Sequence, residues 1–393
     1  MNITYDLYSK FSCASDCVDK CCKPNRWQID IDSNTFKMYS NVVGAFGDEL
    51  RAAIDSSNEL ARFRANENGY CFFYGDDGLC KLQKTWGHDK LSRTCRLYPR
   101  GGYIYNDILH LTLSLSCSEA AKLLLLHKEG LLFISRDENP KDLEYEKDPN
   151  LQIEKIGYNI RAFCIDILQN RTVPFTLRLV LIAQAFKDLS QFPFTQENEQ
   201  KLTDIVALYT QRTPSPDLYE DSLNIKDTLL SASENIYTLL YDLMKQIINQ
   251  KEVSDENVKF YEQINRFYEQ KDRIGHSDIK SLKATLFDPY YFNHEYVFEN
   301  YFVNSLFCTN FPMHKKGPLT AYLHILLDYL MLQVFIATLN FDKDNLTDED
   351  IIYSICYFSQ RTKNSGGYDR ILDQMIDVLG GTDILSPVLC LLI

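Results

Sequence analysis

Apolar and polar residues recur with a helical period over most of the chain beyond residue 155. A period of about 3.6 residues places the apolar side chains on one face of each helix, so this part is predicted to be a multi-helix domain. The predicted helices cover residues 156–171, 175–191, 196–212, 226–250, 255–272, 295–308, 319–340, 348–361 and 368–379. Two of them have local start signals, a capping box at Thr347 and Asp350 and the pair Gly317-Pro318.

The first third of the chain has shorter patterns. Alternation of apolar and polar residues predicts short strands, and glycine-rich stretches between strands predict hairpin turns. The predicted strands and hairpins are a strand at 27–32, a hairpin joining 71–74 to 79–82, and a second hairpin joining 103–105 to 110–115. Two helices are also predicted, one carrying Phe36, Tyr39, Val42 and Val43, and one over residues 116–127 with Ser118 as its N-cap.

These patterns predict a mainly α protein in which a small cysteine-rich α+β domain precedes a multi-helix domain. The segment 137–155 is charged and contains two prolines, which is typical of a linker. The predicted division is therefore a cysteine-rich metal-cluster domain at 1–136, a linker at 137–155 and a helical domain at 156–393.

The most apolar stretch runs from Leu319 to Leu339, and a polar stripe of Thr320, His324 and Asp328 interrupts it at every fourth residue. A membrane-spanning helix seldom carries both Asp and His, so a buried helix is predicted and no membrane partner is expected. The stripe is either a hydrogen-bonded set of polar side chains in the core or a set that points into a cavity.

The net charge of −13 is unevenly placed. Residues 1–125 contain fifteen Lys or Arg and fifteen Asp or Glu, so the rest of the chain carries the whole negative excess. This balance argues against a nucleic-acid partner. One basic run stands out, and its members are Lys81, Lys84, Lys90, Arg93, Arg96 and Arg100. It is either a solvated face or a source of positive charge beside thiolates or an anionic ligand.

Cysteines carry the strongest chemical signal. Eight of the twelve lie in the first third of the chain, at Cys13, Cys17, Cys21, Cys22, Cys71, Cys80, Cys95 and Cys117. The N-terminus has no basic stretch followed by an apolar run, so a cytoplasmic location is expected, where thiols stay reduced and bind metals more often than they form disulfides. Cys164, Cys308, Cys356 and Cys390 lie singly in apolar helical patterns and are predicted to be core residues.

The cysteine spacing narrows the kind of metal site without fixing it. Zinc knuckles and ribbons favour pairs of cysteines two residues apart, and the first run is instead C-x3-C-x3-C-C. The same run misses the C-x3-C-x2-C signature of the adenosylmethionine-radical enzymes by one residue, and the strand–helix repeats of their barrel are missing. Iron–sulfur and zinc centres, one or two in number, stay open at this point, as does a disulfide framework.

Longer stretches around the N-terminal cysteines, and two stretches in the helical part, form a recognisable pattern. They are Phe11-x-Cys13-x3-Cys17-x3-Cys21-Cys22-x4-Trp27, Cys71-x8-Cys80, Cys95-Arg96-x-Tyr98-Pro99-Arg100, Leu115-Ser116-Cys117-x-Glu119, Glu299-Asn300-Tyr301-x2-Asn304 and Phe311-Pro312. Together they resemble the flagellin lysine-N-methylase family, most specifically over residues 1–125. Part of the cysteine pattern is also similar to a wider family of iron- or zinc-chelating cysteine-cluster domains.

The resemblance implies a cytoplasmic enzyme that methylates lysine side chains of flagellin, uses S-adenosylmethionine and carries an iron–sulfur cluster of the 4Fe-4S type on the eight N-terminal cysteines. Arg93, Arg96 and Arg100 are then candidate contacts for the cofactor carboxylate, or they belong to a structural network of cations and carboxylates. The catalytic base stays unknown. His88 and His110 lie nearest the cysteines among the histidines, and each is expected to be structural. The alternative function is a non-enzymatic iron- or zinc-binding protein.

Overall fold

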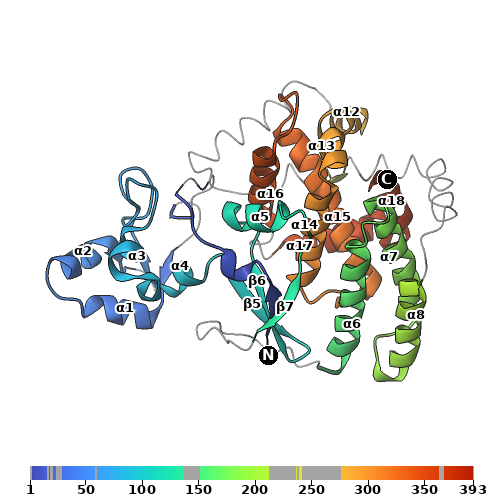
Figure 1. Cartoon of the computed structure of the whole chain (residues 1–393), viewed down its shortest axis with the longest axis horizontal. Helices are drawn as coiled ribbons and strands as arrows, with labels where there is room; N and C mark the ends of the chain where they lie inside the picture. The colour runs from blue at the N-terminus through green and yellow to red at the C-terminus, as the bar shows by residue number, and fades with distance from the viewer. Residues whose placement is uncertain are drawn as a thin grey trace.

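The computed structural model describes residues 2–15, 17, 21–23, 29–57, 60–136, 151–211, 236, 239–240, 276–362 and 367–392. In Figure 1 a small lobe of short helices lies at one end of the molecule, a sheet lies in the middle, and long helices fill the other end. The mainly α fold class with a small cysteine-rich α+β part at the N-terminus is confirmed.

The small lobe combines a three-stranded antiparallel sheet, in the order β2-β4-β3, with four short helices. Its elements are β2 (Asp30–Ile31), α1 (Ser33–Ser40), α2 (Ala45–Ala53), β3 (Ile54–Asp55), β4 (Ala61–Phe63), α3 (Lys81–Trp86) and α4 (Arg93–Leu97). Asp32 caps α1, because its carboxylate accepts from the Thr35 N–H at 3.0 Å. A compact core with Tyr39, Leu50 and Phe63 at its centre belongs to this lobe alone.

The predicted strand at 27–32 is confirmed at Asp30–Ile31, and residues 24–28 lie outside the described residues. Two other predictions for this region were wrong in part. Helix α1 ends at Ser40, so Val43 lies beyond it with 88% of its surface exposed. The hairpin predicted at 71–82 is reduced to a single bridge between Tyr74 and Cys80, because the chain enters α3 at Lys81.

The central sheet has the strand order β5-β6-β1-β7. Its strands are β5 (Arg100–Tyr105), β6 (Ile108–Leu113), β1 (Asn2–Tyr5) and β7 (Phe133–Arg136). The hairpin predicted at 103–115 is confirmed as β5 and β6, with Tyr103 opposite His110. Asn106 and Asp107 make its two-residue turn with φ of 52° and 55°, the left-handed conformation that such turns require.

The helix predicted at 116–127 is α5 (Ser118–Leu125), but Cys117 is its N-cap residue. Ser118 is already the first helical residue, and its hydroxyl lies 3.0 Å from the Cys17 sulfur. The prediction of Ser118 as the N-cap was therefore wrong by one residue, since sequence alone could not show that this hydroxyl is used elsewhere.

The second half of the chain is helical. Its described helices are α6 (Leu151–Leu168), α7 (Phe175–Leu189), α8 (Glu199–Gln211), α12 (His276–Leu282), α13 (Asp288–Asn293), α14 (Glu295–Phe307), α15 (Pro318–Leu339), α16 (Asp348–Thr362), α17 (Tyr368–Leu379) and α18 (Leu385–Leu392). Both start signals are confirmed: Thr347 and Asp350 bond reciprocally, and Gly317 precedes Pro318 at the first turn of α15.

The helices predicted at 226–250 and 255–272 lie outside the described residues, apart from residues 236, 239 and 240. The same holds for residues 137–150 of the predicted linker, and α6 already begins at Leu151 within that linker. Helices α12, α13 and α18 were not predicted. Each is short, and the first two are continuous with a π-helical turn at Lys283–Phe287, so they show no full amphipathic period.

Helix α15 runs through the middle of the helical part, where α7, α14, α16, α17 and α18 pack around it. All its side chains from Leu319 to Leu339 are buried. Among the described helices it is the one long and apolar enough to cross a membrane, and its most apolar window is 100% buried inside the protein. The prediction of a buried core helix is confirmed.

A single hydrophobic core joins the central sheet and α5 to the helical part. Tyr5 of β1, Leu124 of α5 and Phe307 of α14 all belong to it. The core of the small lobe is separate. The cysteine-rich N-terminal region thus contributes to both cores, and the predicted domain boundaries stay a prediction.

Candidate functional site

Of the eight N-terminal cysteines, four precede β2, three lie between β4 and the end of α4, and Cys117 is the N-cap residue of α5. They differ in exposure: Cys71 and Cys117 are buried, Cys13 is exposed, and the other five are half-buried. Two sets of four can be told apart. The lobe group is Cys22, Cys71, Cys80 and Cys95, and the junction group is Cys13, Cys17, Cys21 and Cys117.

The lobe group belongs to the core of the small lobe. Cys71 is part of that core, and the other three members pack against it. The N–H of Cys71 donates to the Cys22 carbonyl at 2.6 Å, which brings these distant segments together. Burial, together with the neighbouring Cys22 and Cys80 thiols, raises the pKa of Cys95 to about 12, because nearby negative charges would repel one another.

The junction group belongs to the other core. Cys117 is a member of that core, and Cys17 lies against the neighbouring Ser118. Burial raises the pKa of Cys117 to about 12, and the Cys17 and Cys13 thiols act in the same direction. Cys21 completes the group, since the Cys13 and Cys117 thiols both contribute to raising its pKa.

The two groups meet at Cys21 and Cys22. The hydrogen bond between the Cys21 and Cys22 side chains is the largest cause of the raised pKa of Cys21, followed by burial. Four thiols are the ligand set of an iron–sulfur cluster or of a structural zinc ion, so the donor chemistry of each group fits a thiophilic metal. A bound cation also removes the cost of placing several thiolates side by side.

The C-terminal helices hold the junction group in place through α5. On α16, the Cys356 sulfur and the Gln360 amide both donate to the Ser116 carbonyl, at 3.0 and 2.9 Å, one residue before Cys117. At the other end of α5, the Asn300 amide donates to the Leu124 and Leu125 carbonyls. The long helical part therefore fixes the helix that carries one of the cysteines.

Asn300 belongs to the run Glu299-Asn300-Tyr301-x2-Asn304, and each of its four named side chains bonds a different element. Tyr301 donates to Asp328 on α15 at 2.6 Å, and Asn304 accepts from Tyr5 on β1 at 2.6 Å. Glu299 has only 1% of its side-chain surface exposed and pairs with Arg171 at 2.9 Å and with Arg178 at 2.7 Å. These contacts make α14 the connection between the sheet, α5 and the helical core.

The structure also tests the predictions for the four later cysteines and for the polar stripe of α15. Cys164 and Cys356 are buried as predicted, whereas Cys308 is half-buried, so the core prediction was wrong for it. The side chain of Cys390 lies outside the described side chains. Asp328 is buried and bonded to Tyr301, so that part of the polar stripe is a satisfied polar group in the core.

The guanidinium groups of Arg96 and Arg100 bond to backbone carbonyls, whereas Arg93 bonds through its own backbone. The backbone N–H of Arg93 donates to the Asp32 carboxylate, and the Arg96 guanidinium donates to the carbonyls of Asp89 and Leu91. Arg100 donates to the Phe11 carbonyl at 3.2 Å, and its guanidinium lies 4.9 Å from the centre of the Phe11 ring. The contacts of Arg93 and Arg96 lie within the small lobe, and that of Arg100 joins β5 to the segment before Cys13. The role of the three arginines toward a cofactor stays a prediction.

Tyr98 and the two histidines near the cysteines have different surroundings. The Tyr98 hydroxyl lies 3.1 Å from the Ser116 hydroxyl, and its pKa is raised by burial and by the Cys117, Cys356 and Cys21 thiols. His88 is exposed. His110 is fully buried on β6, stacked on Tyr103, and its Nε2 lies 2.7 Å from an Arg161 nitrogen.

Arg161 was not expected from the sequence. Its guanidinium is buried, and it lies over the rings of Tyr105, Tyr158 and Phe307 at 4.6, 5.4 and 5.7 Å. No carboxylate among the described residues pairs with it, so cation–π contacts and hydrogen bonds stabilise the charge. The sequence does not reveal this arrangement, because the three rings come from β5, α6 and α14 and meet only in the folded chain.

Burial and the Arg161 charge lower the pKa of His110 to about 3. The unfolded chain binds a proton at this position below pH 6.5 and the folded chain does not, so stability falls as the pH drops below 6.5. Lowering the pH from 7 to 5 should reduce the free energy of unfolding of the wild type by about 2 kcal/mol more than that of His110→Gln. Glutamine keeps an acceptor for Arg161. Urea unfolding at both pH values measures this, and equal losses would contradict it.

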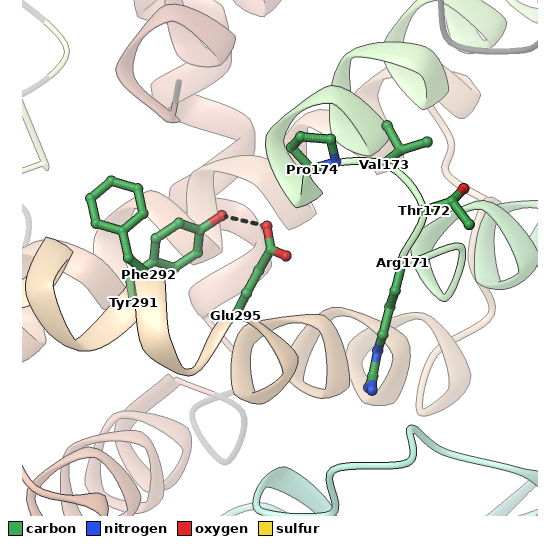
Figure 2. A pocket seen from close by; sticks show the side chains of 7 residues that line it. All are labelled: Arg171, Thr172, Val173, Pro174, Tyr291, Phe292 and Glu295. Carbon is green, nitrogen blue, oxygen red and sulfur yellow. Dashed lines mark hydrogen bonds between the residues drawn. The ribbon is translucent and has the colours of Figure 1, made fainter.

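A pocket of about 320 Å³ lies between the α6–α7 connection and α13 with the start of α14 (Figure 2). Its lining consists of Arg171, Thr172, Val173, Pro174, Tyr291, Phe292 and Glu295. Figure 2 shows the Tyr291 hydroxyl directed at Glu295, to which it donates at 3.4 Å. The charged side chains are already paired, Arg171 with Glu299 and Glu295 with Arg178, so the pocket has no spare charge for a ligand.

Three metal-ligand side chains also meet in the C-terminal half. The Asp373 carboxylate lies 3.4 Å from the His314 imidazole, 3.3 Å from the His324 imidazole and 3.7 Å from the Lys316 ammonium. The Lys316 N–H donates to Nδ1 of His314, which leaves the proton on Nε2 to face Asp373. The two imidazoles and the Lys316 ammonium therefore already pair with the Asp373 carboxylate.

Comparisons with known proteins give one consistent answer. Residues 161–390 match the family model described as the FliB lysine N-methylase C-terminal domain. A lysine-N-methylase of Salmonella typhimurium is 21% identical over 97% of this chain and 96% of its own length. One from Salmonella choleraesuis is 21% identical over 96% of each chain. The flagellar biosynthetic protein FliU of Salmonella muenchen is 33% identical over 29% of this chain and 71% of its own length. No solved structure matches.

Proposed function

The chain belongs to the FliB lysine N-methylase family, which makes it a protein-lysine methyltransferase, and from this we propose that it methylates lysine side chains of flagellin with S-adenosylmethionine as the methyl donor. We propose further that the N-terminal cysteines bind an iron–sulfur cluster and that the enzyme works in the cytoplasm. The family match over residues 161–390 is the observation that carries the reaction, since any methylase needs a methyl donor. The eight cysteines within the first 117 residues support the cluster.

The reaction sets clear demands on the protein. The neutral Nζ of a lysine attacks the methyl carbon of the donor, a nitrogen–carbon bond forms, and the carbon–sulfur bond breaks with its electron pair going to sulfur. The products are methyl-lysine and S-adenosylhomocysteine, and one proton leaves Nζ for a base or for water. The site must therefore accept the lysine uncharged, because the ammonium has no lone pair.

The junction group is the better placed of the two cysteine groups to serve this reaction. Its Cys13 is exposed, so a cofactor can approach from solvent, and its Cys117 is fixed by helices of the family-matched part of the chain. An iron–sulfur cluster, when bound, would supply iron as a ligand site for amino and carboxylate groups. Arg100, the first residue of β5, donates to the Phe11 carbonyl two residues before Cys13, and its guanidinium could pair with an anionic carboxylate.

Donor binding tests this proposal. We expect calorimetry of the anaerobically purified protein to show binding of S-adenosylmethionine, and Arg100→Ala to weaken it by on the order of 2–3 kcal/mol, the cost of losing a charged partner for the donor carboxylate. Arg51→Ala, at an exposed pair with Asp48 in the small lobe, is the matched control and should bind normally. A protein with an intact metal centre that binds no donor would favour a metal-binding role without catalysis.

A further inference from the structure

We propose that the eight N-terminal cysteines hold two separate thiophilic metal centres, one in the lobe group and one in the junction group. The lobe group would be a closed structural centre, and the junction group would be the centre that serves methyl transfer. Only this last assignment rests on the proposed function. The number of centres follows from how the cysteines are placed in the fold.

The two groups lie against different hydrophobic cores. Cys71 lies inside the core of the small lobe, with Cys22, Cys80 and Cys95 packed against it. Cys117 lies in the core that joins the sheet to the helical part, beside Cys17. A single centre that used cysteines of both groups would have to draw its ligands from both cores.

The lobe group is held together by contacts within the small lobe. Its members come from three distant segments, and backbone bonds of the lobe itself bring them together. Cys71 donates to the Cys22 carbonyl, and Tyr74 bridges to Cys80 directly before α3. Ser92 caps α4 and accepts from the Cys95 N–H. All four cysteines are at least half-buried, as expected for a metal site closed to solvent.

The number of cysteines also fits two centres. A cubane iron–sulfur cluster and a structural zinc ion each take four thiolates. One centre would therefore leave four of the eight thiols without a bound metal. Two centres use all eight. Cys21 and Cys22 are consecutive, so this dipeptide would supply one ligand to each centre.

Metal content and spectra of the anaerobically purified full-length chain test the inference. We expect the wild type to bind the metal of two centres, either two iron–sulfur clusters or one cluster and one zinc ion, which iron, zinc and sulfide analysis distinguishes. Cys71→Ala should lose one centre, Cys117→Ala should lose the other, and the two variants should lose different spectral features. Cys164→Ala, at a buried cysteine outside both groups, should keep both.

Wild-type metal content alone decides the case if a variant does not fold. A wild type that binds only one centre, or variants that lose the same signal, would overturn the two-centre inference. Such a result would leave the proposed function standing if flagellin is still methylated. Two centres without methyl transfer would support the inference and count against the proposed function instead.

Discussion

Serine at Cys22 should destabilise the protein by several kcal/mol or abolish its soluble expression. Cys22 is a predicted ligand in a lobe with a small core of its own, and there the binding free energy of the metal is also folding free energy. A serine hydroxyl is a poor substitute for a thiolate on a thiophilic metal. Urea unfolding monitored by circular dichroism, together with soluble yield, measures the effect.

Cys356→Ser is the matched control for this experiment. The Cys356 sulfur is buried and donates to the Ser116 carbonyl, a role that a hydroxyl can also fill. The same substitution should therefore cost far less there. Similar mild losses at both positions would mean that the N-terminal cysteines are not metal ligands.

Glu299→Ala should lower the free energy of unfolding by about 3 kcal/mol, because it removes the buried one of the two carboxylates that pair with the buried Arg178 guanidinium. Arg178 has 2% of its side-chain surface exposed and pairs with Glu299 at 2.7 Å, while its other carboxylate partner, Glu295, is partly exposed. Arg171 would lose its bidentate contact as well. The midpoint of urea unfolding is the measurement.

Glu199→Ala provides the comparison. Glu199 forms an exposed pair with Lys155 at 3.3 Å, and such surface pairs contribute about 0–1 kcal/mol. Equal costs at Glu199 and Glu299 would show that the buried network does not hold α14 in place. A large cost at Glu299 alone is the expected result.

The helical half was predictable because its signals are local. Amphipathic spacing marked α7, α8, α14, α16 and α17, and a capping box marked one helix start. Helix α15 was recognised as buried from the Asp and His within its apolar run, and the structure surrounds it with helices on all sides. The short helices α12, α13 and α18 were missed, since fewer than ten residues give no reliable period.

The cysteine-rich region was predictable in composition but not in arrangement. The hairpin of β5 and β6 follows from alternation, whereas the parallel pairing of β1 with β6 joins residues about a hundred positions apart and leaves no local signal. The same applies to the two cysteine groups. Their members are gathered by two different cores, and spacing along the chain does not show which core a cysteine joins.

The run that begins at Glu299 was recognised from the sequence, but the structural role of its side chains was not. Sequence marked these residues as part of a family pattern, and nothing in the pattern indicates what they bond. In the fold each of them reaches a different element, and Asn300 reaches the helix that Cys117 caps. The helical part of the chain is thereby tied to the N-terminal cysteines.

Mass spectrometry of flagellin tests the central claim most directly. The intact protein, purified anaerobically, is incubated with S-adenosylmethionine and the flagellin of the same organism, and flagellin peptides are then analysed. The account predicts mass increases in steps of one methyl group on lysine residues, and their loss with a Cys117→Ala variant that remains folded. Flagellin that stays unmethylated, although the wild-type protein has its metal centres and binds the donor, would contradict it.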